Sequence, residues 1–232
     1  MKPTYIDINY LGQPNLIACA VLPTRDGIVL IDPGPTVALP SLAQGLKKIG
    51  YALQDVCAVL LTHIHLDHAG ATGTLVRQAP NIDVYVHAIG AKHLVAPERL
   101  LRSAGRIYGD QMDTLWGAFE AVPQERVHKL GGGEVLQFGE TKLDVAYTPG
   151  HAVHHVSYFN EDTGIAYVGD VAGMRVSGCD YVLPVAPPPD VHIPCWEESL
   201  AIVSEWAPET LFVTHFGPSG GVETHLAPIP FK

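Results

Sequence analysis

The sequence predicts a mixed α/β fold in which two β-sheets meet at a cleft. Strand-like segments alternate with helical ones, and this order repeats in the second half of the 232 residues. Several of the expected strands end in histidine or aspartate, and loops on a rigid sheet can hold such side chains in fixed positions. A hydrophobic content of 47% with 16% charged residues is typical of a chain with a substantial core.

In the first half of the chain, apolar runs bounded by turn residues predict strands, and Asp26-Gly27 marks a hairpin turn. The expected strands lie at residues 5–11, 16–22, 28–32, 56–61 and 82–87. Apolar residues at helical spacing predict the helices. These lie at residues 37–49, 71–78 and 91–120, the last broken at Pro97 and Gly105.

The second half repeats this order of strands and helices. The expected elements are strands at 135–138 and 142–148, a hairpin over 156–170, a helix over 197–206 and a strand at 211–214. Three of these strands lead directly to His151, Asp170 and His215. Polar side chains from both halves are therefore expected at one cleft between the sheets.

The most informative motif is Thr-His-Ile-His-Leu-Asp-His-Ala-Gly at residues 62–70. Alternate side chains of an extended chain share a face, so His63 and His65 can bind one ion. The turn that follows would direct Asp67 and His68 toward a second ion. The spacing therefore suggests two adjacent metals.

Composition excludes several classes of partner. Lys and Arg number 14 against 24 Asp and Glu, a formal charge of −10, which argues against nucleic acid. The sequence contains no apolar stretch of the roughly 20 residues that a membrane span needs and no signal-peptide segment near Met1, so a cytoplasmic protein without a membrane partner is expected. A small-molecule substrate is expected, and a homodimer is an open alternative to a monomer. The cysteines form no disulfide framework or zinc knuckle: Cys19, Cys57, Cys179 and Cys195.

Five segments together resemble the metallo-β-lactamase superfamily, in its glyoxalase II-like or lactonase-like hydrolase branch. They are Leu30-Ile31-Asp32-Pro33-Gly34, residues 62–70, Thr148-Pro149-Gly150-His151, Tyr167-Val168-Gly169-Asp170 and Thr214-His215-Phe216-Gly217-Pro218. The match covers nearly the whole chain, so residues 1–232 are taken as a single domain. The resemblance implies a four-layer αββα sandwich with a dinuclear metal site at one edge of the two sheets.

The resemblance also implies the ligands. The first metal would take His63, His65 and His151, the second would take Asp67, His68 and His215, and Asp170 would bridge both. The family normally binds zinc, although iron and manganese tolerate the same ligands. A metal-bridging hydroxide would attack the substrate, which leaves catalytic roles for Asp170 and for Asp67, the latter as a proton carrier to the leaving group.

Other residues are expected to support this centre. Asp32 is a candidate for orienting a ligand imidazole, the alternative being a turn-forming aspartate. His155 resembles the second histidine of the family pattern T-P-G-H-x-x-G-H, but His154 stands where that pattern has glycine. Four glycines are interpreted as backbone hinges beside the ions: Gly34, Gly70, Gly150 and Gly169.

Two segments are candidates for the substrate pocket. The proline-rich loop 173–196 leaves one expected ligand and returns toward another, with Tyr181 as its expected catalytic contact. The helical excursion 91–120 would form the opposing wall. Alternatively, the loop is only a connection and the aromatic residues of the excursion only pack on the sandwich.

Hydrolysis of an ester, lactone or thioester is the favoured activity. True β-lactamases of this fold usually lack the bridging aspartate, and a glutathione substrate is weakened because Lys232 is the sole Lys or Arg in the 17 residues after His215. A phosphodiesterase would use the same metals, but the acidic balance disfavours long nucleic acids. A persulfide dioxygenase with one iron remains an alternative of a different class.

Overall fold

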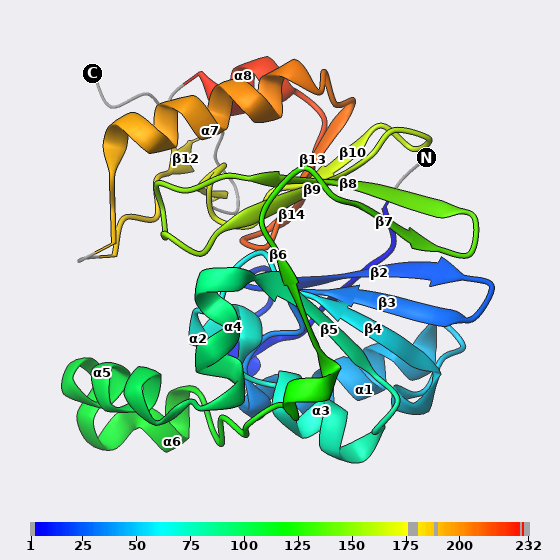
Figure 1. Ribbon diagram of the computed structural model, residues 1–232, viewed down its shortest axis with the longest axis vertical. Coiled ribbons are helices and arrows are strands. Elements are labelled where there is room, and N and C mark those ends of the chain that lie inside the picture. Colours follow the sequence, from blue (N-terminus) through cyan, green and yellow to red (C-terminus); the bar gives the residue numbers. More distant parts are fainter. Residues whose placement is uncertain (1–2, 176–180, 188–189, 228, 230–232) are drawn as a thin grey trace.

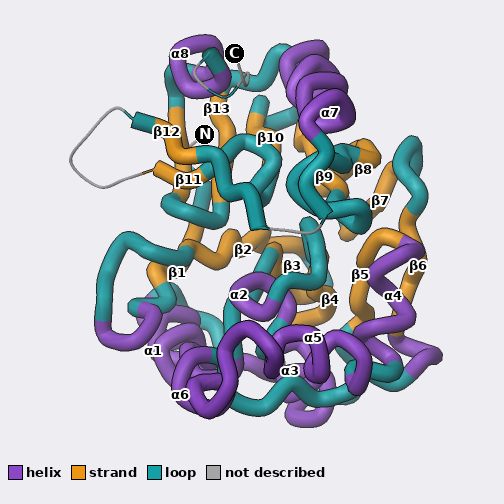
Figure 2. Tube along the Cα trace, turned by 90° about the vertical axis from the view of Figure 1, so that its left-hand side faces the viewer, coloured by secondary structure: helices purple, strands orange, loops and turns teal. Residues whose placement is uncertain are grey.

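Two six-stranded sheets face each other, and helices cover their outer faces (Figures 1 and 2). The computed structural model describes residues 3–175, 181–187, 190–227 and 229. Figure 1 shows α1 and α3 beneath the first sheet and α7 and α8 above the second. This layering confirms the predicted αββα sandwich.

The first sheet has the order β1-β2-β3-β4-β5-β6. Its strands are β1 (Tyr5–Asp7), β2 (Ala18–Thr24), β3 (Gly27–Ile31), β4 (Val56–Leu60), β5 (Asp83–His87) and β6 (Val127–Leu130). The first three strands run antiparallel, whereas β3 to β6 are parallel neighbours. The helices that follow the strands of this half are α1 (Leu39–Lys48), α2 (Leu66–Ala69), α3 (Thr72–Gln78), α4 (Ala88–Val95), α5 (Glu98–Tyr108) and α6 (Met112–Leu115).

The second sheet has the order β14-β13-β10-β9-β8-β7. Its strands are β7 (Val135–Phe138), β8 (Thr141–Tyr147), β9 (Val156–Asn160), β10 (Ile165–Tyr167), β13 (Thr210–Val213) and β14 (Gly217–Ser219). A separate two-stranded ribbon and two helices complete this half: β11 (Met174–Arg175), β12 (Val182–Leu183), α7 (Ile193–Glu205) and α8 (Val222–Leu226). Strands β10 and β13 are parallel neighbours, so their carboxyl ends share one edge.

The alternation of side chains along β2 shows why the sheet separates two cores. Ala18, Ala20 and Leu22 pack between the two sheets. Cys19 and Val21 face the core between the first sheet and the helices α1 and α3. Successive residues of a strand point to opposite faces, so a strand covered on both sides is apolar throughout. A third core lies between the second sheet and α7, around the buried Trp196.

Most predicted elements are present, with two kinds of difference. The excursion breaks after Val95, close to the expected Pro97, but α5 continues through Gly105 to Tyr108. The edge strands β6 and β14 were not predicted, because Val-His-Lys-Leu and Gly-Pro-Ser lack a clear apolar pattern.

Two further findings concern the described residues alone. Cys19, Cys57 and Cys195 are free thiols, as expected, whereas Cys179 lies outside the described residues. Within the described ranges, every helix is too short or too polar to cross a bilayer.

Candidate metal centre

Seven histidine and aspartate side chains meet where strands of both sheets end. His63 and His65 follow β4, and Asp67 and His68 lie in α2. The remaining three follow β8, β10 and β13: His151, Asp170 and His215. The structure thus brings together all seven residues that the sequence proposed as metal ligands.

The first group consists of three imidazoles. His63 Nε2 lies 2.9 Å from His65 Nδ1, and His151 Nε2 lies 3.2 and 3.1 Å from these two atoms. Burial lowers the pKa of His65 to about 4 and also lowers the pKa values of His63 and His151. Neutral rings with converging nitrogen atoms are the form that binds a divalent ion.

The second group contains Asp67, His68 and His215. Asp67 Oδ2 lies 3.3 Å from His215 Nε2 and 3.8 Å from His68 Nε2. One oxygen and two nitrogen atoms therefore converge in a second place beside the first.

Asp170 lies between the two groups, and only 1% of it is exposed. Its Oδ2 is 3.5 Å from His151 Nε2 and 4.0 Å from His63 Nε2. Its Oδ1 is 3.3 Å from His68 Nε2 and 3.6 Å from His215 Nε2. Each carboxylate oxygen thus faces a different group.

Three carboxylates make the surroundings of His68 negative, which favours a cation there. Burial disfavours a charge on His68, but the carboxylates of Asp170, Asp67 and Asp32 raise its pKa well above the ordinary value. In the described structure, His68 Nε2 and Asp170 Oδ1 are buried 3.3 Å apart, yet neither meets the geometry of a hydrogen bond with the other or with a third group. A buried polar atom without a partner is costly, so both atoms fit metal ligation.

Asp32 holds several parts of the centre together. Its carboxylate accepts hydrogen bonds from Thr62 N at 2.9 Å, Thr62 Oγ1 at 2.7 Å and Thr214 Oγ1 at 2.8 Å. It also lies 2.8 Å from His68 Nδ1, which therefore donates and leaves Nε2 directed at the cluster. This geometry supports the orienting role expected of Asp32 over the simple turn.

Other ligand tautomers are fixed by groups that the sequence interpretation missed. His151 Nδ1 donates to Val185 O at 2.6 Å, and His215 Nδ1 donates to Leu16 O at 2.8 Å. Thr62 Oγ1 gives its proton to Asp32 and so accepts from His63 Nδ1 at 3.0 Å. A threonine directly before a ligand histidine, as in Thr62-His63 and Thr214-His215, was a readable signal, whereas the two carbonyl partners left none.

His154 and His155 have different positions. His155 is fully buried, stacks on His63 with ring centroids 5.2 Å apart, and places Nδ1 2.9 Å from Thr148 Oγ1. It therefore supports the first group from behind. His154 lines the cavity beside the cluster, with its ring 5.6 Å from His65.

The four proposed hinge glycines divide into two kinds. Gly34, Gly150 and Gly169 have positive φ, and a Cβ on Gly169 would lie 2.5 Å from Thr62 Oγ1. Gly70 has a helical backbone with φ −55°, so the hinge interpretation is wrong there. Glycine is needed at that position because a Cβ would lie 2.5 Å from Leu66 O.

A cavity of about 280 Å³ opens beside the candidate ligands His65, Asp67 and Asp170. One wall comes from α5 and Trp116, and the other from Val185, Pro187 and Asp190. Both expected walls, 91–120 and 173–196, therefore contribute, although Pro188 and Pro189 lie outside the described residues.

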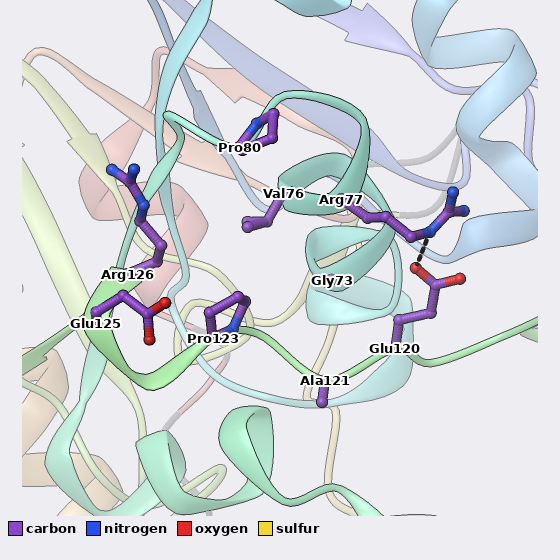
Figure 3. A pocket seen from close by; sticks show the side chains of 9 residues that line it. All are labelled: Gly73, Val76, Arg77, Pro80, Glu120, Ala121, Pro123, Glu125 and Arg126. Carbon is purple, nitrogen blue, oxygen red and sulfur yellow. Dashed lines mark hydrogen bonds and ion pairs between the residues drawn. The ribbon is translucent and has the colours of Figure 1, made fainter.

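A second hollow lies between α3 and residues 120–126, where Arg77 Nε pairs with Glu120 at 2.7 Å (Figure 3). Its lining includes none of the seven candidate ligands. The metal centre therefore identifies the smaller cavity as the candidate active site.

Tyr181 does not reach this cavity, contrary to the expectation that it contacts substrate. It is 57% exposed and lines a separate hollow with Arg175, Ser219 and His225. The reason is the ribbon pairing, in which Arg175 lies opposite Val182, so the chain returns to the cavity only at Val185.

We accordingly expect Tyr181→Phe to leave kcat/KM within about twofold of the parent, because its hydroxyl lies outside the candidate active site. Steady-state kinetics on any cleaved ester measures this. A tenfold fall with unchanged metal content would restore Tyr181 as a substrate contact.

Comparison with known proteins places this geometry in a family. Residues 13–215 match the model of the metallo-beta-lactamase superfamily. The chain belongs to the metallo-β-lactamase superfamily. One relative is the metallo-beta-lactamase fold-containing protein ST1585 of Sulfurisphaera tokodaii, to which the chain is 30% identical over 192 residues. These residues cover 82% of this chain and 68% of that protein.

Further matches include one more curated relative and two solved structures. The hydroxyacylglutathione hydrolase of Acaryochloris marina is 29% identical over 160 residues, 65% of this chain and 50% of that protein, so the chain spans about half its length. The solved structure of ST1585 from Sulfolobus tokodaii has a TM-score of 0.78 at 25% identity, over 98% of this chain and 85% of that one. The metallo-β-lactamase SMB-1 has a TM-score of 0.68 at 16% identity, over 99% and 90%, and shows the shared fold alone.

Proposed function

We propose that the chain is a hydrolase that uses two divalent metal ions to cleave an ester, thioester or lactone bond in a small molecule. The observation that supports it most is the position of Asp170, whose two carboxylate oxygens face two different ligand groups. Nitrogen and oxygen ligands in this combination suit zinc.

The seven candidate ligands form two groups, one for each proposed ion. His63, His65 and His151 would hold one ion, and Asp67, His68 and His215 the other, with Asp170 shared between them. Bound ions would supply Lewis acidity, which lowers the pKa of water and polarises a substrate oxygen.

Asp67 is the member of the cluster best placed to move a proton. Its side chain is 25% exposed, whereas that of Asp170, which also lines the cavity, is buried. We assign it proton transfer to the departing oxygen or sulfur, in addition to ligation.

The relatives support hydrolysis as the type of reaction, and they support no one substrate as strongly. Several are hydroxyacylglutathione hydrolases, which makes a thioester one candidate, but the chain covers only half or less of each. A persulfide dioxygenase would need one iron, and the presence of the second ligand group favours the dinuclear hydrolase.

Protein purified without chelator should contain close to two metal ions per chain. Elemental analysis measures this, and a panel of esters, thioesters and lactones assayed with the same sample tests hydrolysis. His68→Ala should lower the content toward one, because it removes a ligand of the second group alone. A parent value that stays at one after metal addition, together with oxygen uptake on a persulfide, would overturn the proposal.

A further inference from the structure

The candidate active site has one wall made by a single face of α5. Leu100, Ala104 and Ile107 recur at helical spacing and all line the cavity. Ile107 is 69% exposed, although it is a large apolar residue. The opposite wall adds the apolar residues Val185 and Pro187.

Aromatic rings extend this surface toward the metal ligands. Tyr108 and Trp116 both line the cavity and meet edge to face, with centroids 5.1 Å apart. Tyr10 stacks on Trp116 at 5.9 Å and holds it in place, with its own hydroxyl donating to Leu115 O at 2.9 Å. The result is a largely apolar surface, interrupted by Ser103 and His154, that continues to Asp67.

The charges of α5 are directed away from the cavity. The helix carries Arg99, Arg102 and Arg106, all exposed, and none of them lines the cavity. On a helix Arg102 lies opposite Leu100, Ala104 and Ile107, and Arg99 and Arg106 lie to one side of that face. Among the described residues, the lining contains no lysine or arginine, and its only acidic group outside the metal cluster is Asp190.

We infer that the substrate has an uncharged, apolar part attached to its scissile bond and that this part lies against Leu100, Ala104, Ile107 and Trp116. This inference rests on the proposed function. A carboxylate or phosphate on that part of the substrate would find no basic partner and would lie near Asp190, with nothing to offset its lost hydration. An apolar chain would instead bury surface on both walls.

The test compares two esters of equal chain length, p-nitrophenyl hexanoate and the mono-p-nitrophenyl ester of adipic acid. With metal-loaded protein, kcat/KM should be at least about tenfold higher for the neutral ester. Ile107→Arg should raise the relative value of the anionic ester about tenfold, whereas Arg106→Gln, at a neighbouring position that does not line the cavity, should leave the ratio unchanged. Equal values, or a preference for the anionic ester, would overturn the inference while leaving hydrolysis intact.

A binding measurement separates this inference from the proposed function. The neutral probe 6-propionyl-2-(dimethylamino)naphthalene should gain fluorescence with metal-loaded protein and lose affinity in Ile107→Arg. The anionic probe 8-anilinonaphthalene-1-sulfonate should show no binding that depends on Ile107. Tighter binding of the anionic probe at this site would contradict the inferred apolar substrate, whether or not either ester is cleaved. Failure to cleave either ester would count against the proposed ester hydrolysis instead.

Discussion

Asp170→Ala should lower kcat/KM about a thousandfold, a loss of roughly 4 kcal/mol of transition-state stabilisation. The reason is geometric, because Oδ2 faces His63 and His151 while Oδ1 faces His68 and His215. Without this carboxylate, two bound cations would be less neutralised, and no side chain would face both ligand groups. Kinetics on the best substrate, with metal added in excess, measures the effect.

Two comparisons keep the Asp170 experiment specific. Circular dichroism should show the parent fold for Asp170→Ala, since the change removes a buried acid and adds no bulk. Asp170→Cys restores one ligand atom and should recover metal content more than turnover. A rate for Asp170→Ala equal to that of the parent would show that this residue does not join the two groups.

Removing the metals should lower the thermal midpoint by about 5–10 °C. An ion that binds only the folded chain adds about 2.7 kcal/mol when its concentration is 100 times the dissociation constant. In a chain of this size, each kcal/mol corresponds to about 2–4 °C. Calorimetry before and after dialysis against chelator measures the shift.

Readdition of zinc should restore the midpoint, and His151→Ala provides the matched control. This variant lacks a ligand of the first group, so chelator should change its midpoint less than that of the parent. An identical shift in the parent and in His151→Ala would show that the stabilising ion binds elsewhere.

The strands and the convergence of the candidate ligands could be predicted because their signals are local. The histidines of residues 62–70 follow an apolar strand, and His151 and His215 each follow another, so position along the chain was sufficient. The resemblance then divided the ligands into two groups, which the distances now place together. An apolar strand followed by a polar residue is visible in the sequence without knowledge of the tertiary contacts.

The pocket contacts could not be predicted in the same way. The position of Tyr181 depends on how β11 pairs with β12, and a single sequence does not reveal that register. Asp190 and Val185 reach the cavity from a segment without periodicity, and the outward direction of the α5 arginines becomes meaningful only once another face of that helix is known to line the cavity. The supporting carbonyls of Leu16 and Val185 are backbone groups, which any residue supplies.

The hydrogen bonds of Asp32 link assembly of the sandwich to its chemistry. Its carboxylate accepts a hydrogen bond from Thr62, just after β4 in one sheet, and another from Thr214, just after β13 in the other sheet. The same carboxylate orients His68. Sliding of one sheet over the other would therefore also displace His68 from the candidate metal centre. Metal affinity then reports on the alignment of the two halves, and a distant core substitution that shifts their docking should weaken metal binding without touching a ligand.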